Sequence, residues 1–542
     1  MKIQFYNSLA KIFPEEVKGC LCKRGSVLKD EIFHFAFCLK NEESYPLRNH
    51  CVLIRSDLEK FCRCYRAGYV PALYTDRTYG DDYTIYGKSG LYPDPLFACN
   101  TEEQIFSPGV NAGFVVEVGG TGEPLPVGEH KIEISVADGG GKRVCSDIFV
   151  LKIIDERLAE NDLLITEWIH FDCIAEQHGC EMFSENFYKA CGEYFRTAVK
   201  YGQTMILTPL FTFPLDTEIG GERLTFQTVG VKADGGKYFF DFSELKKFID
   251  FAFGCGFKYI EFSHLFTQWG AMHAPKVMAS VDGAYRRLFG WDTDSAGEEY
   301  VGFLEAFLPK LAEFVEQNGL KGKCFIHLSD EPSADAMPRY RMLKDIVKKN
   351  LGGVPVMDAL SEYDFCAQGA VDLPAVAMDH TEKFIANKTA FLAYYCNCQC
   401  KDYLTNRFLD MPSQRNRILG FQLYGMEAKG FLHWGFNFYN SALSSFTIDP
   451  YRVTDAGGCF PAGDSFIVYP SETGCNHSLR LLVFHEGIQD YLALKRIESL
   501  KGKEFARNLL KEEGIDGVSF YPRSDERHIA FREKLNSILE KA

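Results

Sequence analysis

The sequence has no apolar run long enough to cross a membrane and no block of basic residues. Nowhere do about eighteen apolar residues follow one another, and the N-terminus, MKIQFYNSLAKIFPEEVKG, lacks the apolar centre of a signal peptide. With 59 Lys and Arg against 74 Asp and Glu, the formal net charge is −15. These features argue against a transmembrane protein, a partner of anionic lipid and a nucleic-acid binder.

Tryptophan is scarce in this chain, with 4 residues, whereas phenylalanine is abundant, with 46. Phenylalanine is usually a core residue, so the aromatic content does not by itself identify a ligand. Of the 542 residues, 46% are hydrophobic and 25% are charged, which is typical of a globular protein with a large core. A chain of this length is expected to form several domains.

The 19 cysteines, in a chain without an export signal, are expected to be reduced thiols of a cytoplasmic protein. Cys396, Cys398 and Cys400 alternate in the segment YYCNCQCKD, and on a strand they would share one face, as a soft-metal site requires. Structural zinc usually requires CxxC spacing and a fourth ligand, and neither occurs nearby. Free thiols at a strand end are the preferred interpretation.

Residues 1–155 carry the short alternating runs and turn residues of an all-β region. The clearest pair of runs covers residues 130–137, with Ile132, Ile134 and Val136 on one face, and residues 144–154. Glycines at positions 139–141 separate the two runs, and this pattern predicts a β-hairpin. We therefore expect residues 1–155 to form an N-terminal β-sandwich domain.

Residues 156–500 alternate apolar strand-like runs with amphipathic helical segments, which predicts an α/β fold with parallel strands. Eight such units in succession favour a (β/α)8 TIM-like barrel. A doubly wound open sheet is the alternative, but the first strand lacks a glycine-rich phosphate turn. The predicted strands occupy residues 163–169, 204–212, 259–266, 324–328, 355–360, 375–378, 391–395 and 430–436, and helices are predicted at 244–253, 301–317, 337–349, 415–429 and 478–499.

Two further segments lie outside this alternation. The insert at residues 449–473 is expected to form a loop over the barrel mouth, because insertions in barrels typically enlarge the loops at the catalytic face. Residues 501–542 are expected to form a C-terminal helical extension.

The most informative stretch is KCFIHLSDEP, residues 323–332, in which a buried strand ends in two acids and a proline. Catalytic residues of a barrel lie at the carboxyl ends of its strands, and Pro332 stops the strand so that Asp330 and Glu331 can face the mouth. Two adjacent carboxylates do not ionise independently, and the one with the raised pKa suits a general acid. The alternative is a helix start, with Ser333 or an acid as the cap.

Several segments, taken in their order along the chain, resemble those of one enzyme family. They are VP at 70–71, YPDPL at 92–96, EWIHFDCIA at 167–175, SDEP at 329–332, GDSFIVYP at 463–470, SLR at 478–480 and HEGIQDY at 485–491. Together they resemble glycoside hydrolase family 123, the β-N-acetylgalactosaminidases whose catalytic domain also carries the domain-of-unknown-function label 4091. The resemblance extends over about residues 50–495.

The resemblance implies an enzyme that removes terminal β-linked N-acetylgalactosamine from a glycan or small saccharide by a substrate-assisted, retaining mechanism. In that mechanism the 2-acetamido oxygen of the substrate attacks the anomeric carbon and forms an oxazoline intermediate. Glu331 would be the general acid and then the base, and Asp330 would orient the acetamido nitrogen and stabilise its charge. No cofactor and no metal ion are expected. Preference for N-acetylgalactosamine over N-acetylglucosamine stays open.

Further substrate-binding candidates follow from their positions at predicted strand ends. Flat walls for a sugar ring and its acetamido methyl group are expected from tryptophans, although each is equally consistent with a core position. Tyr395 is expected to hydrogen-bond the acetamido oxygen, and Asn437 and Tyr439 to contact sugar hydroxyls. The full set of candidates is Trp168, His170, Asp172, Trp269, His327, Tyr395, Trp434, Asn437 and Tyr439.

Two other functions are compatible with this pattern. Zinc-dependent barrel hydrolases place His-x-Asp pairs at strand ends, as in His170 and Asp172, with His264, His327 or the pair at 379–380 as further ligands. A buried histidine is, however, more often a hydrogen-bonded packing residue. A non-catalytic carbohydrate-binding protein is the other alternative, and the retained Asp330-Glu331 pair argues against it.

Overall fold

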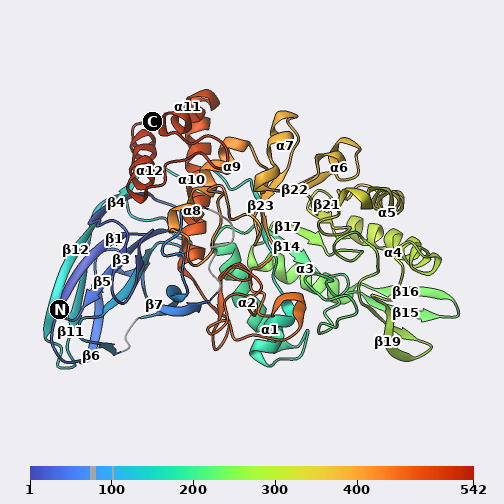
Figure 1. Cartoon of the computed structure of the whole chain (residues 1–542), viewed down its shortest axis with the longest axis horizontal. Helices are drawn as coiled ribbons and strands as arrows, with labels where there is room; N and C mark the ends of the chain where they lie inside the picture. Colours follow the sequence, from blue (N-terminus) through green and yellow to red (C-terminus); the bar gives the residue numbers. More distant parts are fainter. Residues whose placement is uncertain (74–80, 100–102) are drawn as a thin grey trace.

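The N-terminal part of the chain consists of two five-stranded sheets that share one core (Figure 1). The computed structural model describes residues 1–73, 81–99 and 103–542. The first sheet has the order β1 (Lys2–Asn7), β5 (Phe33–Lys40), β10 (Asn111–Val118), β7 (Cys62–Ala72) and β8 (Gly90–Ala98). The second has the order β4 (Arg24–Leu28), β12 (Arg143–Ile154), β11 (Gly128–Ala137), β6 (Leu47–Arg55) and β9 (Gln104–Phe106), and a small pair consists of β2 (Lys11–Ile12) and β3 (Val17–Lys18).

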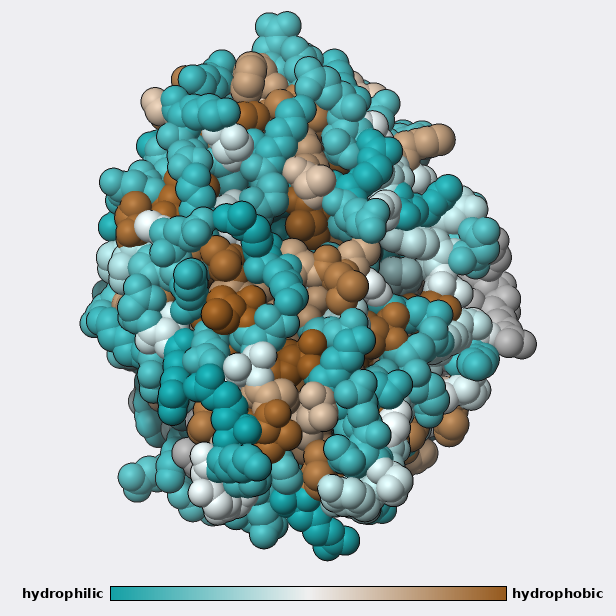
Figure 2. All heavy atoms as spheres, turned by 90° about the vertical axis from the view of Figure 1, so that its left-hand side faces the viewer, coloured by the Kyte–Doolittle hydropathy of each residue, from teal (hydrophilic) through white to brown (hydrophobic). Residues whose placement is uncertain are grey.

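Phenylalanines join the two sheets. Phe35 of the first sheet stacks on Phe149 of the second, with ring centroids 4.1 Å apart, and Phe5 contacts both. The predicted hairpin is confirmed, because β11 and β12 pair antiparallel along their length. On the face that this end of the molecule turns to solvent, apolar side chains form small separate groups among hydrophilic ones (Figure 2).

Eight parallel strands follow in the described part of the chain, and each overlaps one predicted run. One sheet has the order β13-β24-β23-β22-β21 and the other the order β14-β17-β20. A parallel bridge between Ile326 and Val356 links the two sheets on one side, and on the other the Thr204 N–H donates to the Ile165 oxygen at 3.0 Å. The strands are β13 (Leu164–Glu167), β14 (Met205–Thr208), β17 (Tyr259–Phe262), β20 (Cys324–Ile326), β21 (Met357–Ala359), β22 (Leu373–Ala377), β23 (Leu392–Tyr394) and β24 (Gly430–His433).

Most strands are shorter than the apolar runs that predicted them, because the buried runs continue into loops at the carboxyl ends. The helices that follow the strands cover the outside of the two sheets (Figure 1). The predicted helix at residues 415–429 is divided in two at Ile418. The helices are α1 (Phe171–His178), α2 (Glu185–Lys200), α3 (Ser243–Cys255), α4 (Glu298–Gln317), α5 (Met337–Asn350), α6 (Tyr363–Ala367), α7 (Glu382–Ala386), α8 (Ser413–Arg417), α9 (Leu419–Met426) and α10 (Leu479–Lys501).

Three additions surround this arrangement. A four-stranded sheet, absent from the sequence prediction, has the order β16 (Lys237–Asp241), β15 (Gly230–Asp234), β18 (Val277–Val281) and β19 (Ala284–Phe289). Residues 449–473 form the predicted long loop, with β25 (Tyr469–Pro470) pairing with β26 (Cys475–Asn476). The C-terminal residues form α11 (Lys503–Glu513) and α12 (Asp525–Glu540), and α12 docks on β4 through the Ser26 N–H, which donates to Glu533 at 2.9 Å. No helix in the described ranges is long and apolar enough to span a bilayer.

A buried ion pair connects the N-terminal sheets to α10. Arg480 donates to Asp94 of β8 through Nη2 at 2.8 Å and Nε at 3.0 Å, and the Tyr469 hydroxyl donates to the same carboxylate at 2.6 Å. All three side chains are almost fully buried. This cluster explains why the segments near Asp94 and Arg480, far apart in sequence, lie together.

We expect Asp94→Ala to lower the free energy of unfolding by about 3–5 kcal/mol, because it leaves the Arg480 charge buried without a partner. Urea unfolding followed by circular dichroism measures the change. As a control, Lys152→Ala removes a solvent-exposed pair with Glu540, and we expect a loss of about 1 kcal/mol or less. Equal losses for the two variants would contradict the stabilising role of the buried pair between Asp94 and Arg480.

Candidate active site

A pocket of about 270 Å³ opens at the carboxyl ends of the parallel strands. Its lining comes from the residues that end or directly follow β13, β20, β21, β23 and β24, and from the long loops after β14, β17 and β24. This is the end at which parallel α/β folds carry their active sites. The lining residues are Trp168, Leu215, Asp216, Gln268, Trp269, Asp330, Glu331, Ala359, Tyr394, Cys396, Asn397, Leu432, Trp434, Ala442, Leu443 and Phe460.

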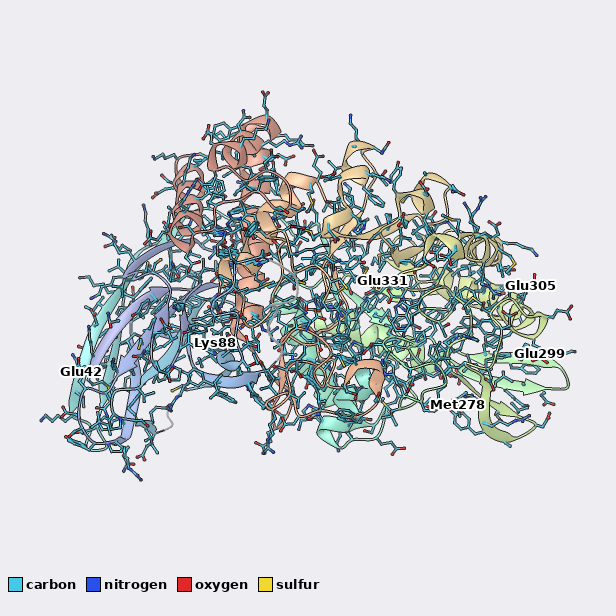
Figure 3. All side chains as sticks on the ribbon, viewed as in Figure 1. Glu42, Lys88, Met278, Glu299, Glu305 and Glu331 are labelled. Atoms are coloured by element: carbon cyan, nitrogen blue, oxygen red, sulfur yellow. The ribbon has the colours of Figure 1, made fainter. Side chains whose placement is uncertain are left out.

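Asp330 and Glu331 both line this pocket, on the segment that follows β20 (Figure 3 labels Glu331 near the middle of the molecule). In a regular strand their side chains would point to opposite faces. Here Glu331 adopts a positive φ of 43°, and its N–H donates to the Ala359 oxygen at 2.9 Å. The Asp330 oxygen accepts the Trp269 N–H at 2.8 Å. This turn brings both carboxyl groups to one wall.

Left-handed backbone conformations recur around the pocket. Asp216, Trp269, Glu331 and Leu443 all have φ between 38° and 58°, and all line the cavity. Such conformations cost about 1–3 kcal/mol for residues with a side chain, and they persist only where the surrounding structure holds them. Hydrogen bonds do so here: the Leu443 N–H donates to the Asp216 carboxylate at 3.1 Å, and the Asp216 N–H donates to Gln268 at 2.6 Å.

Tyr394, at the end of β23, donates its hydroxyl to Glu331 Oε1 at 2.7 Å. Burial and the nearby Glu331 carboxylate raise the pKa of this tyrosine, so it remains a donor. Sequence reasoning chose its neighbour Tyr395, whose side chain faces the other way, donates to Asn416 at 3.4 Å and lies outside the pocket. The alternation of side chains at a strand end accounts for this difference of one residue.

The surroundings of Asp330 have opposite effects on its pKa. Burial raises the pKa of Asp330 well above its usual range, and the Glu331 carboxylate raises it further, whereas His327 lowers it. The raised pKa thus falls on Asp330, while the family resemblance gives the acid role to Glu331. The repulsion between the two acids is thus one cause of the raised pKa of Asp330.

His327 lies beneath the pocket as part of a fully buried ion pair. Its Nε2 contacts Glu261 at 2.7 Å and its Nδ1 contacts Asp358 at 3.2 Å. Burial lowers its pKa, but the hydrogen bonds to Asp358 and Glu261 raise the pKa of His327 to about 9, so it is an imidazolium at neutral pH. The predicted direct contact with substrate is not available from this position, because His327 is outside the lining.

His264, His327 and Asp358 lie close enough together to be considered as metal ligands. Asp358, however, already accepts hydrogen bonds from the backbone N–H groups of Leu328 and Ser329, from Tyr340 and from His327. Both nitrogens of His327 are also engaged. Of the three residues, His264, stacked on His327 with ring centroids 4.4 Å apart, is the one whose ring nitrogens have no hydrogen-bond partner in the described chain. Hydrogen bonding and charge pairing therefore account for this cluster better than a metal ion.

The second zinc hypothesis concerned His170 and Asp172. Arg223 donates to both carboxylate oxygens of Asp172 at 2.7 Å and to His170 Nδ1 at 3.1 Å. A buried guanidinium occupies the place where a zinc ion would have to bind, so this pair is not suited to a cation. Both residues lie outside the pocket lining, and the Asn437 amide bonds to the His170 backbone at 2.9 and 3.0 Å.

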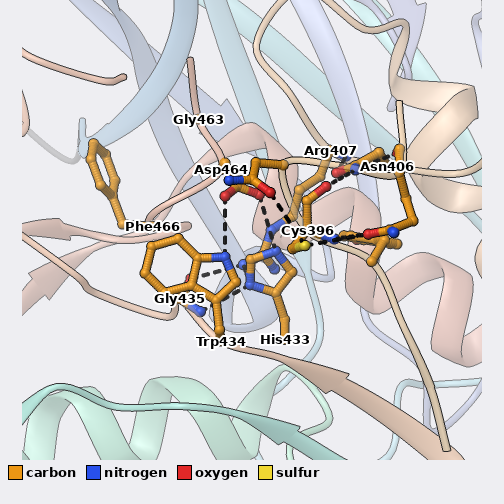
Figure 4. Close-up of polar contacts among 12 residues, drawn as sticks. Cys396, Asn406, Arg407, His433, Trp434, Gly435, Gly463, Asp464 and Phe466 are labelled. Atoms are coloured by element: carbon orange, nitrogen blue, oxygen red, sulfur yellow. Dashed lines mark hydrogen bonds and ion pairs between the residues drawn. The ribbon is translucent and has the colours of Figure 1, made fainter. Parts of the chain in front are cut away.

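Three of the four tryptophans, the three chosen as candidates from the sequence, line the pocket. Trp168 is buried, Trp269 is half exposed at the rim, and Trp434 donates its Nε1–H to Asp464 at 3.1 Å (Figure 4). Burial raises the pKa of Asp464 to about 7, although Arg407 and the Trp434 hydrogen bond lower it. Tyr439, by contrast, donates to the Val468 oxygen at 3.0 Å and is outside the lining.

Several lining residues escaped the sequence prediction. Asp216 lies in the loop after β14, and burial raises the pKa of Asp216 to about 6. An acidic residue after a predicted strand was a pattern by which the sequence could have identified it. Asn397 lies within the cysteine segment, and Phe460 within the predicted mouth loop. Gln268, Asn397 and Phe460 come from loops whose paths depend on tertiary contacts, so no local pattern identified them.

Comparisons with known proteins concern the family and the fold of this chain. The family described as glycoside hydrolase 123, catalytic domain, matches residues 168–497. Among solved structures, a family 123 glycoside hydrolase from Clostridium perfringens has the same fold, with a TM-score of 0.76 at 13% identity, over 100% of this chain and 98% of that one. A family 2 glycosyl hydrolase from Bacteroides cellulosilyticus gives a TM-score of only 0.30 at 11% identity, over 85% of this chain and 49% of its own. A search of curated proteins finds no match.

We expect Tyr394→Phe to lower kcat on a chromogenic glycoside about 10- to 100-fold, because hydrogen bonds to charged groups contribute about 1.5–3 kcal/mol. Tyr395→Phe is the matched control one residue away, and its kcat should stay close to that of the wild type. Steady-state kinetics of both folded variants show which of the two tyrosines supports catalysis. A larger loss in Tyr395→Phe would show that the wrong tyrosine has been assigned.

Proposed function

This chain belongs to glycoside hydrolase family 123, and we propose that it removes terminal β-linked N-acetylgalactosamine from glycans by substrate-assisted, retaining hydrolysis. The observation that carries the proposal is the pair Asp330 and Glu331 on one wall of a tryptophan-lined pocket. The Clostridium perfringens relative is described in terms of glycolipid glycan hydrolysis. Glycans of this kind are therefore the first substrates to test.

We further propose that the eight parallel strands act as one (β/α)8 barrel. The bridge between Ile326 and Val356 and the Thr204 to Ile165 hydrogen bond support closure on both sides. Closure explains why residues from β13, β20, β23 and β24 converge on the same pocket. The limits 1–155, 156–500 and 501–542 stay predictions for the three parts of the chain, as does a cytoplasmic location.

Adjacent carboxylates favour participation by the substrate. An inverting pair needs room for a water molecule across the sugar, and an enzymic nucleophile must face the acid across the anomeric carbon. Neighbours on one wall approach the sugar from nearly one side. In the proposed reaction the acetamido oxygen attacks the anomeric carbon while Glu331 protonates the departing oxygen. Water then opens the oxazoline and returns its proton to Glu331.

The surroundings of the pair suit these roles. Tyr394 orients the Glu331 carboxyl group through its 2.7 Å hydrogen bond. Asp330 would accept the acetamido N–H, a bond that strengthens as positive charge develops on the oxazoline. Burial and Glu331 raise the pKa of Asp330, whereas an N–H donor from the substrate and the His327 charge favour its ionised form.

The tryptophans supply the apolar part of the site. Trp168 provides a buried flat surface and Trp434 a partly buried one for the pyranose face and the acetamido methyl group, and Trp269 offers a half-exposed surface at the rim. The two alternatives are less well supported. The zinc hypothesis conflicts with Arg223 beside Asp172, and a carbohydrate-binding protein has no need for a strained Glu331 held by Tyr394.

We expect Glu331→Gln to lower kcat on a chromogenic β-N-acetylgalactosaminide by about 10²–10⁴, the usual contribution of general acid–base catalysis. The melting temperature and circular dichroism spectrum should stay unchanged. Glu299→Gln, an exposed position in the first turn of α4 (Figure 3), serves as the control and should retain full activity. Near-normal turnover by folded Glu331→Gln would refute the assignment.

We expect Asp330→Asn to lower kcat far more than it changes KM, because the bond to the acetamido nitrogen grows in the transition state. Matched galactosides with a 2-hydroxyl group should be barely hydrolysed by the wild type, and a thiazoline mimic of the intermediate should bind tightly. Steady-state kinetics on the paired substrates test both statements. A covalent glycosyl-enzyme on any carboxylate, or equal rates on the two sugars, would rule out this mechanism.

A further inference from the structure

The segment after β23 places two cysteines beside the catalytic pocket. Residues 396–399 form a turn closed by the Gln399 N–H, which donates to the Cys396 oxygen at 3.3 Å. Cys396 and Asn397 line the pocket, and Cys398 is exposed to solvent. Tyr394, which holds Glu331, precedes this turn by two residues. A change in the turn is therefore a change in the wall of the site.

The thiols of Cys396 and Cys398 converge on one atom. Cys398 Sγ donates to Asn397 Oδ1 at 3.0 Å, and Cys396 Sγ lies 3.5 Å from the same oxygen and 3.3 Å from Gln399 Oε1. The two thiols are also hydrogen-bonded to each other. Cys400, the third cysteine of the segment, instead directs its thiol to the backbone oxygens of Asn397 and Cys398. The sulfurs of Cys396 and Cys398 therefore form a pair, which we term the pocket dithiol.

We propose that the pocket dithiol is a redox modification site, at which a low-molecular-weight disulfide oxidises Cys396 and Cys398 to an intramolecular disulfide that lowers activity. The effect on activity rests on the proposed glycosidase function, whereas the modification does not. The Cys398 thiolate attacks one sulfur of the small disulfide and releases one small thiol. Cys396 then loses its proton, attacks the Cys398 sulfur and releases the second small thiol.

The geometry of the turn permits this bond. Disulfides join Cα atoms about 4.4–6.8 Å apart, and the ends of a β-turn lie within about 7 Å, so residues two apart in the turn are in reach. The direction of attack follows from the surroundings. The hydrogen bond between the thiols lowers the pKa of Cys398 and raises that of Cys396, although the Glu331 carboxylate raises both. The exposed Cys398 is thus the attacking thiolate.

Oxidation would act on the substrate through Asn397. In the reduced protein the Cys398 S–H donates to Asn397 Oδ1, and the amide Nδ2 of Asn397 makes no hydrogen bond to the rest of the described chain, so Nδ2 is left to donate to a substrate in the pocket. A disulfide has no S–H group, and its sulfurs approach to about 2.05 Å. The amide then loses the thiol donor that orients it, and the turn contracts beside Tyr394.

The test exposes the full-length reduced protein to oxidised glutathione and measures both kcat/KM and the masses of proteolytic peptides. We expect a peptide with a Cys396–Cys398 disulfide, lighter by two hydrogen atoms, and a fall in kcat/KM of about three- to tenfold, which corresponds to the loss of one hydrogen bond. Dithiothreitol should restore both. Asn397→Ala should show a similar loss in the reduced state and little further loss on oxidation.

Two serine variants make the test specific. Cys398→Ser keeps a donor for Asn397, so it should be active when reduced and insensitive to oxidation. Cys459→Ser removes an exposed thiol next to Phe460, another pocket residue, and should stay sensitive. Inactivation that persists in Cys398→Ser, protection by Cys459→Ser, or full activity with the disulfide formed would overturn the proposal. If the reduced enzyme cleaves no N-acetylhexosaminide, the proposed function fails, and peptide masses still decide whether the dithiol is oxidised.

Discussion

Adjacent carboxyl groups in a partly buried pocket repel each other, and the residues around Asp330 and Glu331 are arranged to offset that repulsion. The His327 imidazolium, clamped between Glu261 and Asp358, places a positive charge behind the pair. Tyr394 donates to Glu331, and the left-handed turn at Glu331 keeps both acids on one wall. These contacts join residues in or directly after β17, β20, β21 and β23. The site therefore depends on the parallel strands that bring them together.

Buried polar contacts also connect the N-terminal sheets to the pocket. Arg480 on α10 binds Asp94 of the N-terminal sheets and also donates to the Phe466 oxygen in the loop that carries Asp464 and Phe460. Asp464 in turn accepts the Trp434 indole N–H. A chain of buried polar contacts thus runs from the N-terminal sheets to a wall of the pocket. Such contacts are costly to break because each leaves an unpaired buried group.

Functional demands and stability conflict at this pocket. Positive φ angles at Asp216, Trp269, Glu331 and Leu443 store strain that a purely structural loop would avoid. The thiols of Cys396 and Cys398 add chemical reactivity beside the catalytic acids. Both features lie in segments that follow strands, where the rigid sheets support irregular backbone. The eight parallel strands, all within the described residues, contain no residue with a positive φ.

Local patterns in the sequence determined much of this protein. The apolar runs predicted all eight parallel strands, and the glycines at 139–141 predicted the hairpin of β11 and β12. The Asp330-Glu331 pair and three tryptophans, chosen as candidates from the sequence, line the pocket. These predictions succeeded because periodicity and turn chemistry act over a few residues. Only the tertiary structure decided that Tyr394 rather than Tyr395 faces Glu331, that Arg223 neutralises Asp172, and that His327 pairs with Glu261 and Asp358 below the pocket. Those outcomes depend on side-chain direction and on partners from distant segments, which no local spacing contains.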